Sequence, residues 1–379
     1  MQKKQINYQF KLLYALGMIF IVAGHCHNGG VSLFYDWLPP YAFHIGLFVF
    51  ASGYFYKSKY DNEPTRKYIW KKVKHLLIPL FLWNLFYALL VWLLSYKDFT
   101  IGTPVTPEKI FILPITNGHQ FVWNLGGWFI IPLFMTQVWN IIFRKTILCK
   151  IKSPRKSIYT VLIYLALGLL GIFLANKGLN SGWWLVLTRF LFFLPFYGAG
   201  ILYKEHLEKH DNVKNLPYFS IIFASLLIIL LIFNKIPTYA PSLMAKISEP
   251  IFMPFIMSFL GIAFWLRISR ILTPAIGKNK LINLIADSSY SIMINQFLGF
   301  ALVNLTFAVI NKIITLTPAF NWHEFKTNIW YNYLPNNDSH FFILYLAAGI
   351  AIPILMHNIV LCAIKRHTRK RRKINSKQT

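Results

Sequence analysis

The chain has 379 residues, of which 56% are hydrophobic and 13% are charged, and its mean hydropathy is +0.48. A soluble protein usually carries about 25% charged residues, so this composition excludes a soluble enzyme of ordinary type. Apolar runs of eighteen or more residues recur along the whole chain, which is typical of a polytopic membrane protein. The net charge of +27 would otherwise suggest nucleic acid as a partner, so the distribution of the basic residues is decisive.

The basic residues segregate by loop. With the N-terminus placed in the cytoplasm, thirty of the 39 Lys and Arg residues lie in cytoplasmic segments and seven lie on the opposite side, while Lys11 and Arg189 lie inside spans. This asymmetry follows the positive-inside rule, so the charge indicates topology and we expect no nucleic-acid partner. Residues 365–379 form a polybasic tail, which we expect to mark the cytoplasmic side and to contact anionic membrane lipids.

Ten hydrophobic spans satisfy both the hydropathy and the alternation of charge, and both termini then lie in the cytoplasm. Because lipid offers no partner for backbone groups, these long runs must be helices, whereas a β-barrel would show short alternating strands. We therefore predict an all-α polytopic integral membrane protein, with about ten transmembrane helices in a single domain over residues 1–379. The predicted spans are 10–29, 38–56, 76–96, 125–143, 158–175, 184–203, 217–234, 250–266, 282–310 and 341–364.

The first span shows no small-x-small cleavage pattern, so we expect it to be retained and not removed as a signal peptide. The three cysteines, Cys26, Cys149 and Cys362, provide neither a disulfide framework nor a metal-ligand spacing, so we expect no metal. The longest outer loops, 97–124 and 311–340, are rich in Pro, Asn, Thr and aromatic residues. They fit either a lid or glycan platform over an outward cavity, or plain connectors.

Three basic side chains fall at nearly the same depth in the outer half of the membrane. Counted along untilted helices, His25 lies about 22 Å from the inner edge of a core about 30 Å thick. His44 and Arg189 lie about 9 Å and 8 Å below the outer edge. Taken singly, each histidine could bond a neighbouring helix and Arg189 could reach the headgroups. Together they predict a functional site, where desolvation and repulsion favour the neutral histidine that a general base requires.

A second pattern connects this depth to the inner side. Tyr14, Met18, Val22 and His25 share one helix face, because eleven residues make three turns. A channel along this face would join a cytosolic donor to the outer site, although ordinary helix packing explains the same pattern. The basic run 71–75 lies at the mouth of the third span, where it could dock phosphate groups or could simply be a positive-inside cluster.

Several blocks of the sequence resemble acyltransferase family 3. The opening of that family is matched, in order and spacing, by residues 12–25 (LLYALGMIFIVAGH), 43–48 (FHIGLF), 52–55 (SGYF) and 71–79 followed by Trp83. Its later motifs are matched by residues 127–130 (GWFI), 194–200 (LPFYGAG) and 288–296 (SSYSIMINQ). The resemblance covers nearly the whole chain, is most specific in the first eighty residues, and is greatest to the fucose 4-O-acetylase-like subgroup acting on bacterial surface sugars.

This resemblance implies a membrane O-acetyltransferase that moves an acetyl group from cytosolic acetyl-CoA, a cosubstrate and not a bound cofactor, to a carbohydrate hydroxyl. The acceptor is a cell-surface carbohydrate or its lipid-linked precursor, and His25 matches the catalytic histidine. The expected acyl-CoA contacts are Tyr14, which stands where the family usually has Arg or Lys, and Lys72 and His75, which replace its Arg-x-x-Arg pair. Neither Lys nor His offers the guanidinium fork for phosphate. Gln296 occupies a place often held by histidine.

We therefore predict that His25 acts as general base on a sugar hydroxyl or as a covalent acetyl-imidazole relay. His44, Arg189 and Ser52 are assigned to the side of the acceptor or oxyanion. The sequence places no base beside Ser52, so we interpret Ser52 as a small packing residue more readily than as a nucleophile. The expected location is the plasma (inner) membrane of a bacterium. A flippase or transporter for an anionic lipid-linked sugar and an inactive membrane scaffold are the alternatives.

Overall fold

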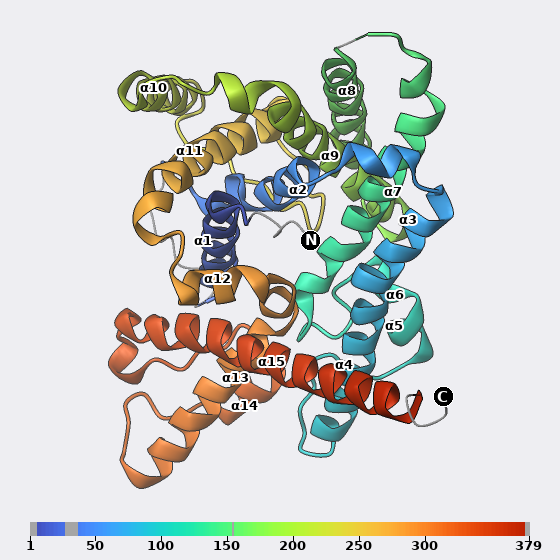
Figure 1. Ribbon diagram of the computed structural model, residues 1–379. Helices are drawn as coiled ribbons and strands as arrows, with labels where there is room; N and C mark the ends of the chain where they lie inside the picture. The colour runs from blue at the N-terminus through green and yellow to red at the C-terminus, as the bar shows by residue number, and fades with distance from the viewer. Residues whose placement is uncertain (1–5, 27–36, 154, 376–379) are drawn as a thin grey trace.

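The computed structural model describes residues 6–26, 37–153 and 155–375, with the backbone alone for residues 363–375. All regular secondary structure in these ranges is helical (Figure 1). Residues 27–29 of the predicted first span and the last four residues of the polybasic tail lie outside the described part. The helices are α1 (Tyr8–His25), α2 (His44–Tyr54), α3 (Thr65–Lys72), α4 (Ile78–Ser95), α5 (Pro107–Phe111), α6 (Leu113–Thr116), α7 (Ile130–Thr146), α8 (Lys156–Asn176), α9 (Gly182–Leu202), α10 (Asn215–Phe233), α11 (Met253–Ile276), α12 (Lys280–Asp287), α13 (Ser289–Ile313), α14 (Trp322–Thr327) and α15 (Phe342–Asn375).

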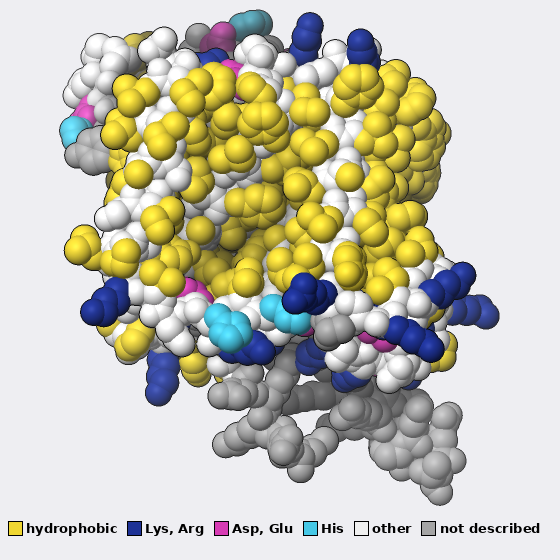
Figure 2. Space-filling model, turned by 90° about the horizontal axis from the view of Figure 1, so that it is seen from above, with side chains coloured by type: hydrophobic (Ala, Val, Ile, Leu, Met, Phe, Trp, Pro, Cys, Tyr) yellow, Lys and Arg dark blue, Asp and Glu magenta, His cyan; other side chains and the backbone are white. Residues whose placement is uncertain are grey.

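Nine helices in the described residues are long and apolar enough to cross a membrane. Figure 2 shows a broad apolar surface between two rims that carry Lys, Arg, Asp, Glu and His side chains. This arrangement confirms the predicted all-α, multi-pass membrane protein. Below, the face at which α1 begins is called the inner face, and the face at which α1 ends is called the outer face.

The predicted second span, residues 38–56, is longer than the helix that the structure contains there, so this prediction is wrong. Helix α2 has 11 residues, which makes it about 16 Å long and too short to cross a core of about 30 Å. A short 3₁₀ turn, η1 (Pro40–Ala42), precedes it, and Phe43 interrupts the helix with a φ of −142°. His44 is therefore the first residue of α2. Irregular backbone at this depth is tolerated where protein buries it, as it does Ala42 and Phe43.

Three other predicted boundaries differ from the structure. The third span begins at Thr65 and not at residue 76, so the basic run 71–75 lies within the helix. The ninth span, 282–310, is divided at Ser288 into α12 and α13. Helix α11 continues to Ile276, so Arg267 lies inside a helix and not in an inner loop.

Helix α1 lies near the centre of the molecule in Figure 1, and it packs against α2, α11, α12, α13 and α15. Its first turn is capped by Asn7, whose side-chain oxygen accepts a hydrogen bond from the backbone N–H of Phe10 at 3.1 Å. Helix α9 is the most buried of the long helices, and α10 is the least buried. The central position of α1 places His25, its last residue, inside the protein and not at the lipid boundary.

Helices α2 and α9 cross with their backbones in contact. A Cβ atom on Gly200 would lie 2.0 Å from the carbonyl oxygen of Phe50, and a Cβ on Gly53 would lie 2.0 Å from that of Tyr197. Real Cβ atoms do not approach other atoms so closely, so both positions require glycine. Small residues of this kind are typical of close helix packing in membranes.

We therefore expect Gly200→Ala to separate α2 from α9 and to lower the thermal midpoint of the detergent-solubilised protein strongly. The matched control is Gly198→Ala on the same helix, where a Cβ would meet the side chain of Tyr164 at 3.0 Å and would have its nearest backbone atom, the Val161 Cα, at an ordinary 3.5 Å. That side chain can shift, so the thermal midpoint of the control should fall much less. Equal thermal midpoints for the two variants would contradict the proposed backbone contact.

Candidate active site

A cavity of about 250 Å³, here called the central cavity, lies between α1, α2, α7, α13 and the segment that joins α10 to α11. It extends along α1 from Tyr14 to His25, which is about 16 Å for eleven helical residues. Its lining is mainly apolar, with a few polar side chains distributed between the two ends. The polar lining residues include Tyr14, His25, Tyr41, His44, Ser52 and Tyr290.

His25 is held by a glutamine from a distant part of the chain. Its Nδ1 lies 3.1 Å from Oε1 of Gln296 on α13. The amide nitrogen of Gln296 donates to the carbonyl of Met293 at 3.2 Å, which orients the amide oxygen toward His25. An amide oxygen only accepts, so Nδ1 carries the proton and donates. The neutral ring therefore keeps an unprotonated Nε2, which is the free basic atom of a side chain that lines the cavity.

Aromatic rings and close backbone packing maintain this arrangement. The His25 ring lies 5.6 Å from the ring of Phe297 and 5.8 Å from that of Trp330, which comes from the predicted outer loop 311–340. Gly126 packs directly on α13, since a Cβ there would lie 2.1 Å from the Met293 carbonyl oxygen. That carbonyl is the one that orients Gln296, so the contact supports the position of the base indirectly.

His44 has the same protonation pattern as His25. Its Nδ1 lies 2.6 Å from the carbonyl oxygen of Pro40, so Nδ1 donates and Nε2 is the unprotonated atom of the neutral ring. The Tyr41 ring stands perpendicular to it at 5.3 Å, and the Tyr41 hydroxyl donates to the Gly24 carbonyl at 2.6 Å. The break before α2 thus brings Tyr41 and His44 to the same end of the cavity as His25.

The helix face predicted on α1, from Tyr14 to His25, is corrected at one position. Tyr14, Met18 and His25 line the central cavity as predicted, but the fourth member is Ile21 and not Val22. Val22 is fully buried and faces Gly349 of α15. Residues 18, 21 and 25 follow the spacing of three and four residues that defines one helix face, whereas residue 22 is rotated toward the neighbouring helix.

Ser52 also lines the central cavity, and its hydroxyl accepts a hydrogen bond from Nε2 of Gln137 at 2.8 Å. The other amide atom of Gln137, Oε1, is buried without a hydrogen-bond partner in the described structure. The sequence offered no reason to select Gln137, because its partner is 85 residues away. Tyr290 closes the inner part of the lining, and its hydroxyl donates to the Leu76 carbonyl at 3.0 Å within the π turn η3 (Val73–Leu77).

Arg189 does not line the central cavity. It is 1% exposed, and its guanidinium group lies over the ring of Trp128 at 5.0 Å. One guanidinium nitrogen donates to the Asn117 carbonyl at 2.8 Å and another donates to the Ser242 carbonyl. These carbonyls belong to two different outer loops, so the geometry favours a role in holding the loops together over direct contact with a substrate.

His119, which the sequence did not single out, does not line the central cavity but lies close enough to Arg189 and His25 to interact with them electrostatically. It lies in the outer loop 97–124, and its Nε2 is buried without a hydrogen-bond partner in the described structure. Burial, followed by repulsion from Arg189 and His25, lowers the pKa of His119 to about 4. The only available signal was its place in a loop that precedes a family motif. The outer loops thus contribute His119 and Trp330 to the surroundings of His25.

We expect the neutral state of His119 to make the stability of the protein depend on pH. The unfolded chain binds a proton at this histidine below pH 6.5, whereas the folded loop does so only near pH 4. Stability should therefore fall as the pH decreases from about 6.5 toward 4. His119→Gln, which does not titrate, should weaken this decline in thermal midpoints measured across the range. Identical declines in the variant and the wild type would contradict this.

A larger cavity, here called the inner pocket, has a volume of about 1060 Å³ and lies at the inner face. It comes close to the central cavity at three places, because residues that line the two cavities are near neighbours in the chain. Lys11, Phe55 and Asp287 line the inner pocket. Tyr14 on α1, Ser52 on α2 and Ser289 at the α12–α13 break line the central cavity. Its lining combines aromatic rings with cations, namely Tyr54, Tyr56, Tyr60, Lys11, Lys57 and Lys204.

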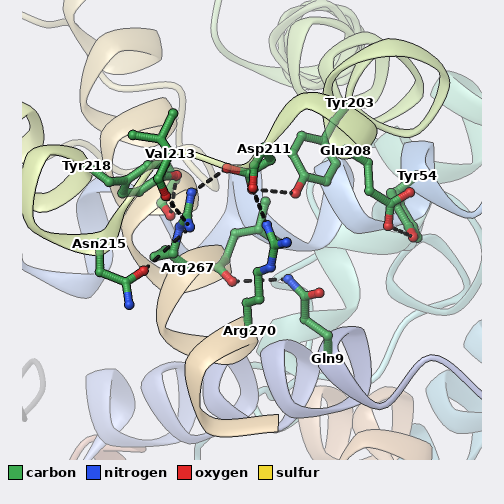
Figure 3. Close-up of polar contacts among 12 residues, drawn as sticks. Gln9, Tyr54, Tyr203, Glu208, Asp211, Val213, Asn215, Tyr218, Arg267 and Arg270 are labelled. Atoms are coloured by element: carbon green, nitrogen blue, oxygen red, sulfur yellow. Dashed lines mark hydrogen bonds and ion pairs between the residues drawn. The ribbon is translucent and has the colours of Figure 1, made fainter. Parts of the chain in front are cut away.

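A polar network lies beside the inner pocket, and its members Tyr54 and Glu208 line the pocket (Figure 3). The Tyr54 hydroxyl donates to Glu208 at 2.6 Å, and Asp211 accepts from the Tyr203 hydroxyl at 3.0 Å and from Arg267. These contacts connect the segment after α9 to both α2 and α11. Among the lysines of the pocket, Lys57 has no side-chain hydrogen bond or ion pair in the described structure.

Lys72 and His75, the predicted acyl-CoA contacts, line neither cavity. The Lys72 ammonium lies 5.2 Å from the centre of the Tyr68 ring, and His75 is exposed with its Nδ1 donating to the Lys71 carbonyl at 2.8 Å. The two residues lie within a helix that begins at Thr65, so they are on the side of this helix and not at its end. Of the three predicted contacts, only Tyr14 lines the central cavity.

The fold and the cavities define a multi-pass membrane protein with a positioned histidine that is reached along an internal cavity. Among the described residues, no group of three or more His, Cys, Asp or Glu side chains is arranged to hold a metal ion. The family model described as "Acyltransferase domain" matches residues 7–357, and the chain therefore belongs to acyltransferase family 3. No curated protein and no solved structure matches the chain.

Proposed function

We propose that this membrane acyltransferase moves an acetyl group from cytosolic acetyl-CoA to a hydroxyl of a cell-surface carbohydrate or its lipid-linked precursor. The observation that supports it most is the geometry of His25, whose Nδ1–H is bound by Gln296 and whose Nε2 is free. A fixed imidazole of this kind is suited to general base catalysis. The fucose 4-O-acetylase-like subgroup and a bacterial plasma membrane are part of the same proposal.

In the proposed reaction, Nε2 of His25 accepts the proton of the acceptor hydroxyl while the oxygen attacks the thioester carbonyl. The tetrahedral intermediate collapses with loss of the CoA thiolate, which takes the proton from the imidazolium and leaves as free CoA. The product is the acetyl ester of the sugar. His44, whose unprotonated Nε2 accepts hydrogen bonds, is suited to orient the acceptor by accepting from one of its hydroxyl groups, whereas its single N–H is used by the Pro40 carbonyl. Neutral histidines favour this chemistry because neither one repels the proton that arrives at His25.

The donor would bind from the inner face. The inner pocket, at about 1060 Å³, is large enough for a nucleotide. Its tyrosines suit stacking on adenine, and Lys57 suits the phosphates. The pantetheine arm would then enter the central cavity past Tyr14 and Ser52, with Gln137 available for its amide groups. This route replaces the predicted phosphate site at Lys72 and His75 with one formed by α1, α2 and the segment after α9.

Acetyl transfer by the purified protein in lipid nanodiscs tests the proposal. Labelled acetyl-CoA and a panel of methyl glycosides of fucose, rhamnose, galactose and glucose should yield an O-acetylated glycoside, detected by mass spectrometry. Movement of a lipid-linked sugar across proteoliposomes without ester formation would overturn the enzyme and support a carrier. Absence of both acetylation and acetyl-CoA hydrolysis would support an inactive scaffold.

A further inference from the structure

A third cavity lies at the outer face, beside the central one. This outer pocket has a volume of about 410 Å³ and is formed by Tyr41 together with the segment between α10 and α11, residues 235–249. Its volume is within the range of small-molecule sites, about 300–1,000 Å³. The polar side chains of its lining include Lys235, Thr238, Tyr239, Lys246, Ser248 and Glu249.

The outer pocket adjoins the catalytic end of the central cavity. Tyr41 and Ala240 line both spaces. The Tyr41 hydroxyl bonds the carbonyl of Gly24, the residue before His25, and its ring contacts His44. Tyr41 and Ala240 therefore lie at the boundary between the outer pocket and the end of the central cavity at which His25 lies.

The charged groups of the pocket suit a hydroxylated ligand. Glu249 is only 11% exposed at its side chain and forms an ion pair with Lys235 at 2.7 Å. A hydrogen bond from Lys235 lowers the pKa of Glu249, so its carboxylate stays charged and can accept hydrogen bonds from hydroxyl groups. Lys246, which also lines the pocket, has no ion pair in the described structure and offers a donor. A pocket that offers both acceptors and donors suits a sugar, whose hydroxyl groups both donate and accept hydrogen bonds.

The segment that forms the pocket is attached to the helices around it. The Asn180 side chain donates to the Met244 carbonyl at 3.2 Å, and the Asn176 side chain accepts from the Ile247 N–H at 3.1 Å. The Tyr239 hydroxyl lies 3.0 Å from the Ala42 carbonyl oxygen, just before α2. The pocket is therefore formed before a ligand binds, which lowers the cost of binding.

We propose that the outer pocket binds the acceptor saccharide, with Glu249, Lys235 and Lys246 holding its hydroxyl groups and Tyr41 guiding one of them to His25. This inference rests on the proposed function, because it assigns the acceptor of the same reaction. It places donor and acceptor on opposite sides of His25, so the two substrates enter from opposite faces of the membrane.

The first experiment compares Glu249→Gln with the wild-type protein in nanodiscs. The variant keeps the size of the side chain but loses the charged acceptor, so KM for the acetylated methyl glycoside should rise about tenfold or more, while KM for acetyl-CoA stays within about twofold. The matched control is Glu108→Gln, an exposed glutamate in another outer loop that lines none of the three cavities. Equal glycoside KM values in both variants would overturn the assignment.

The second experiment measures binding without chemistry. Thr238→Cys is introduced after Cys149 and Cys362, the exposed native cysteines, are replaced by serine. Methyl glycosides from the same panel should slow labelling of this variant by a membrane-impermeant maleimide, and they should not slow labelling of Glu108→Cys. Lack of protection, or equal protection at both positions, overturns the pocket. Protection without any acetylation would support the outer pocket as a saccharide site and overturn the proposed function. Acetylation that Glu249→Gln leaves unaffected would support the proposed function and overturn the outer pocket as the acceptor site.

Discussion

Replacing His25 with alanine should lower kcat for acetyl transfer by about 10² to 10⁴-fold, the usual contribution of a general base. The Nε2 atom that accepts the hydroxyl proton is lost, while the helix ends at the same position and the thermal midpoint should change little. The measurement is single-turnover acetylation of a methyl glycoside in nanodiscs, together with a melting curve. Near-wild-type turnover in His25→Ala would remove this histidine as the base.

Gln296→Leu distinguishes positioning of His25 from mere packing around it. The leucine removes the acceptor of Nδ1–H at 3.1 Å and leaves the backbone of Ile21 as the remaining hydrogen-bond partner of the ring, so the ring is held less firmly. We expect activity between that of the wild type and that of His25→Ala, with the acetyl-CoA KM nearly unchanged. Full activity in Gln296→Leu would show that the hydrogen bond does not orient the base.

Arg189→Leu should be the most destabilising change near the site. Two backbone carbonyls, of Asn117 and Ser242, would lose a charged donor, and hydrogen bonds to charged groups contribute about 1.5–3 kcal/mol each. The expected loss is therefore about 3–6 kcal/mol in the free energy of unfolding, with both outer loops released from Trp128. Thermal midpoints and proteolysis of the outer loops measure it.

Two further variants separate this role from a simple charge effect. Arg189→Lys keeps the charge but lacks the planar fork that reaches two carbonyls, so it should recover only part of the stability. Arg66→Leu removes an arginine that is exposed on α3, and it should leave the midpoint nearly unchanged. If Arg189→Leu melts like Arg66→Leu but loses activity, Arg189 acts on the substrate, as the sequence analysis proposed, and not on the loops.

The parts of the site that could be predicted from the sequence belong to single helices. Tyr14, Met18 and His25 lie on one face because the α-helical repeat alone places them there. The prediction failed at Val22, where the choice between two adjacent positions on the same helix depends on the neighbouring α15. Lys72 and His75 line neither the central cavity nor the inner pocket, and their helix begins at Thr65 and not at residue 76, where the hydrophobic run begins.

The partners of these residues could not be predicted because they are distant along the chain. Gln296 is 271 residues from His25, and Gln137 is 85 residues from Ser52. Such pairs meet only through the packing of one helix against another, which leaves no local pattern in the sequence. The same holds for His119, whose burial depends on two loops and not on its neighbours in sequence.

By itself, the sequence determined that this protein is a helical membrane protein and that His25 lies in its outer half, because hydrophobic length and helical spacing are local properties of a chain in lipid. Only the tertiary structure decided which nitrogen of His25 is free, which loop carbonyls Arg189 contacts, and where the inner and outer pockets lie. Those features depend on contacts between segments far apart in the chain, whose geometry is set by close packing of helices and not by the residues of any one segment.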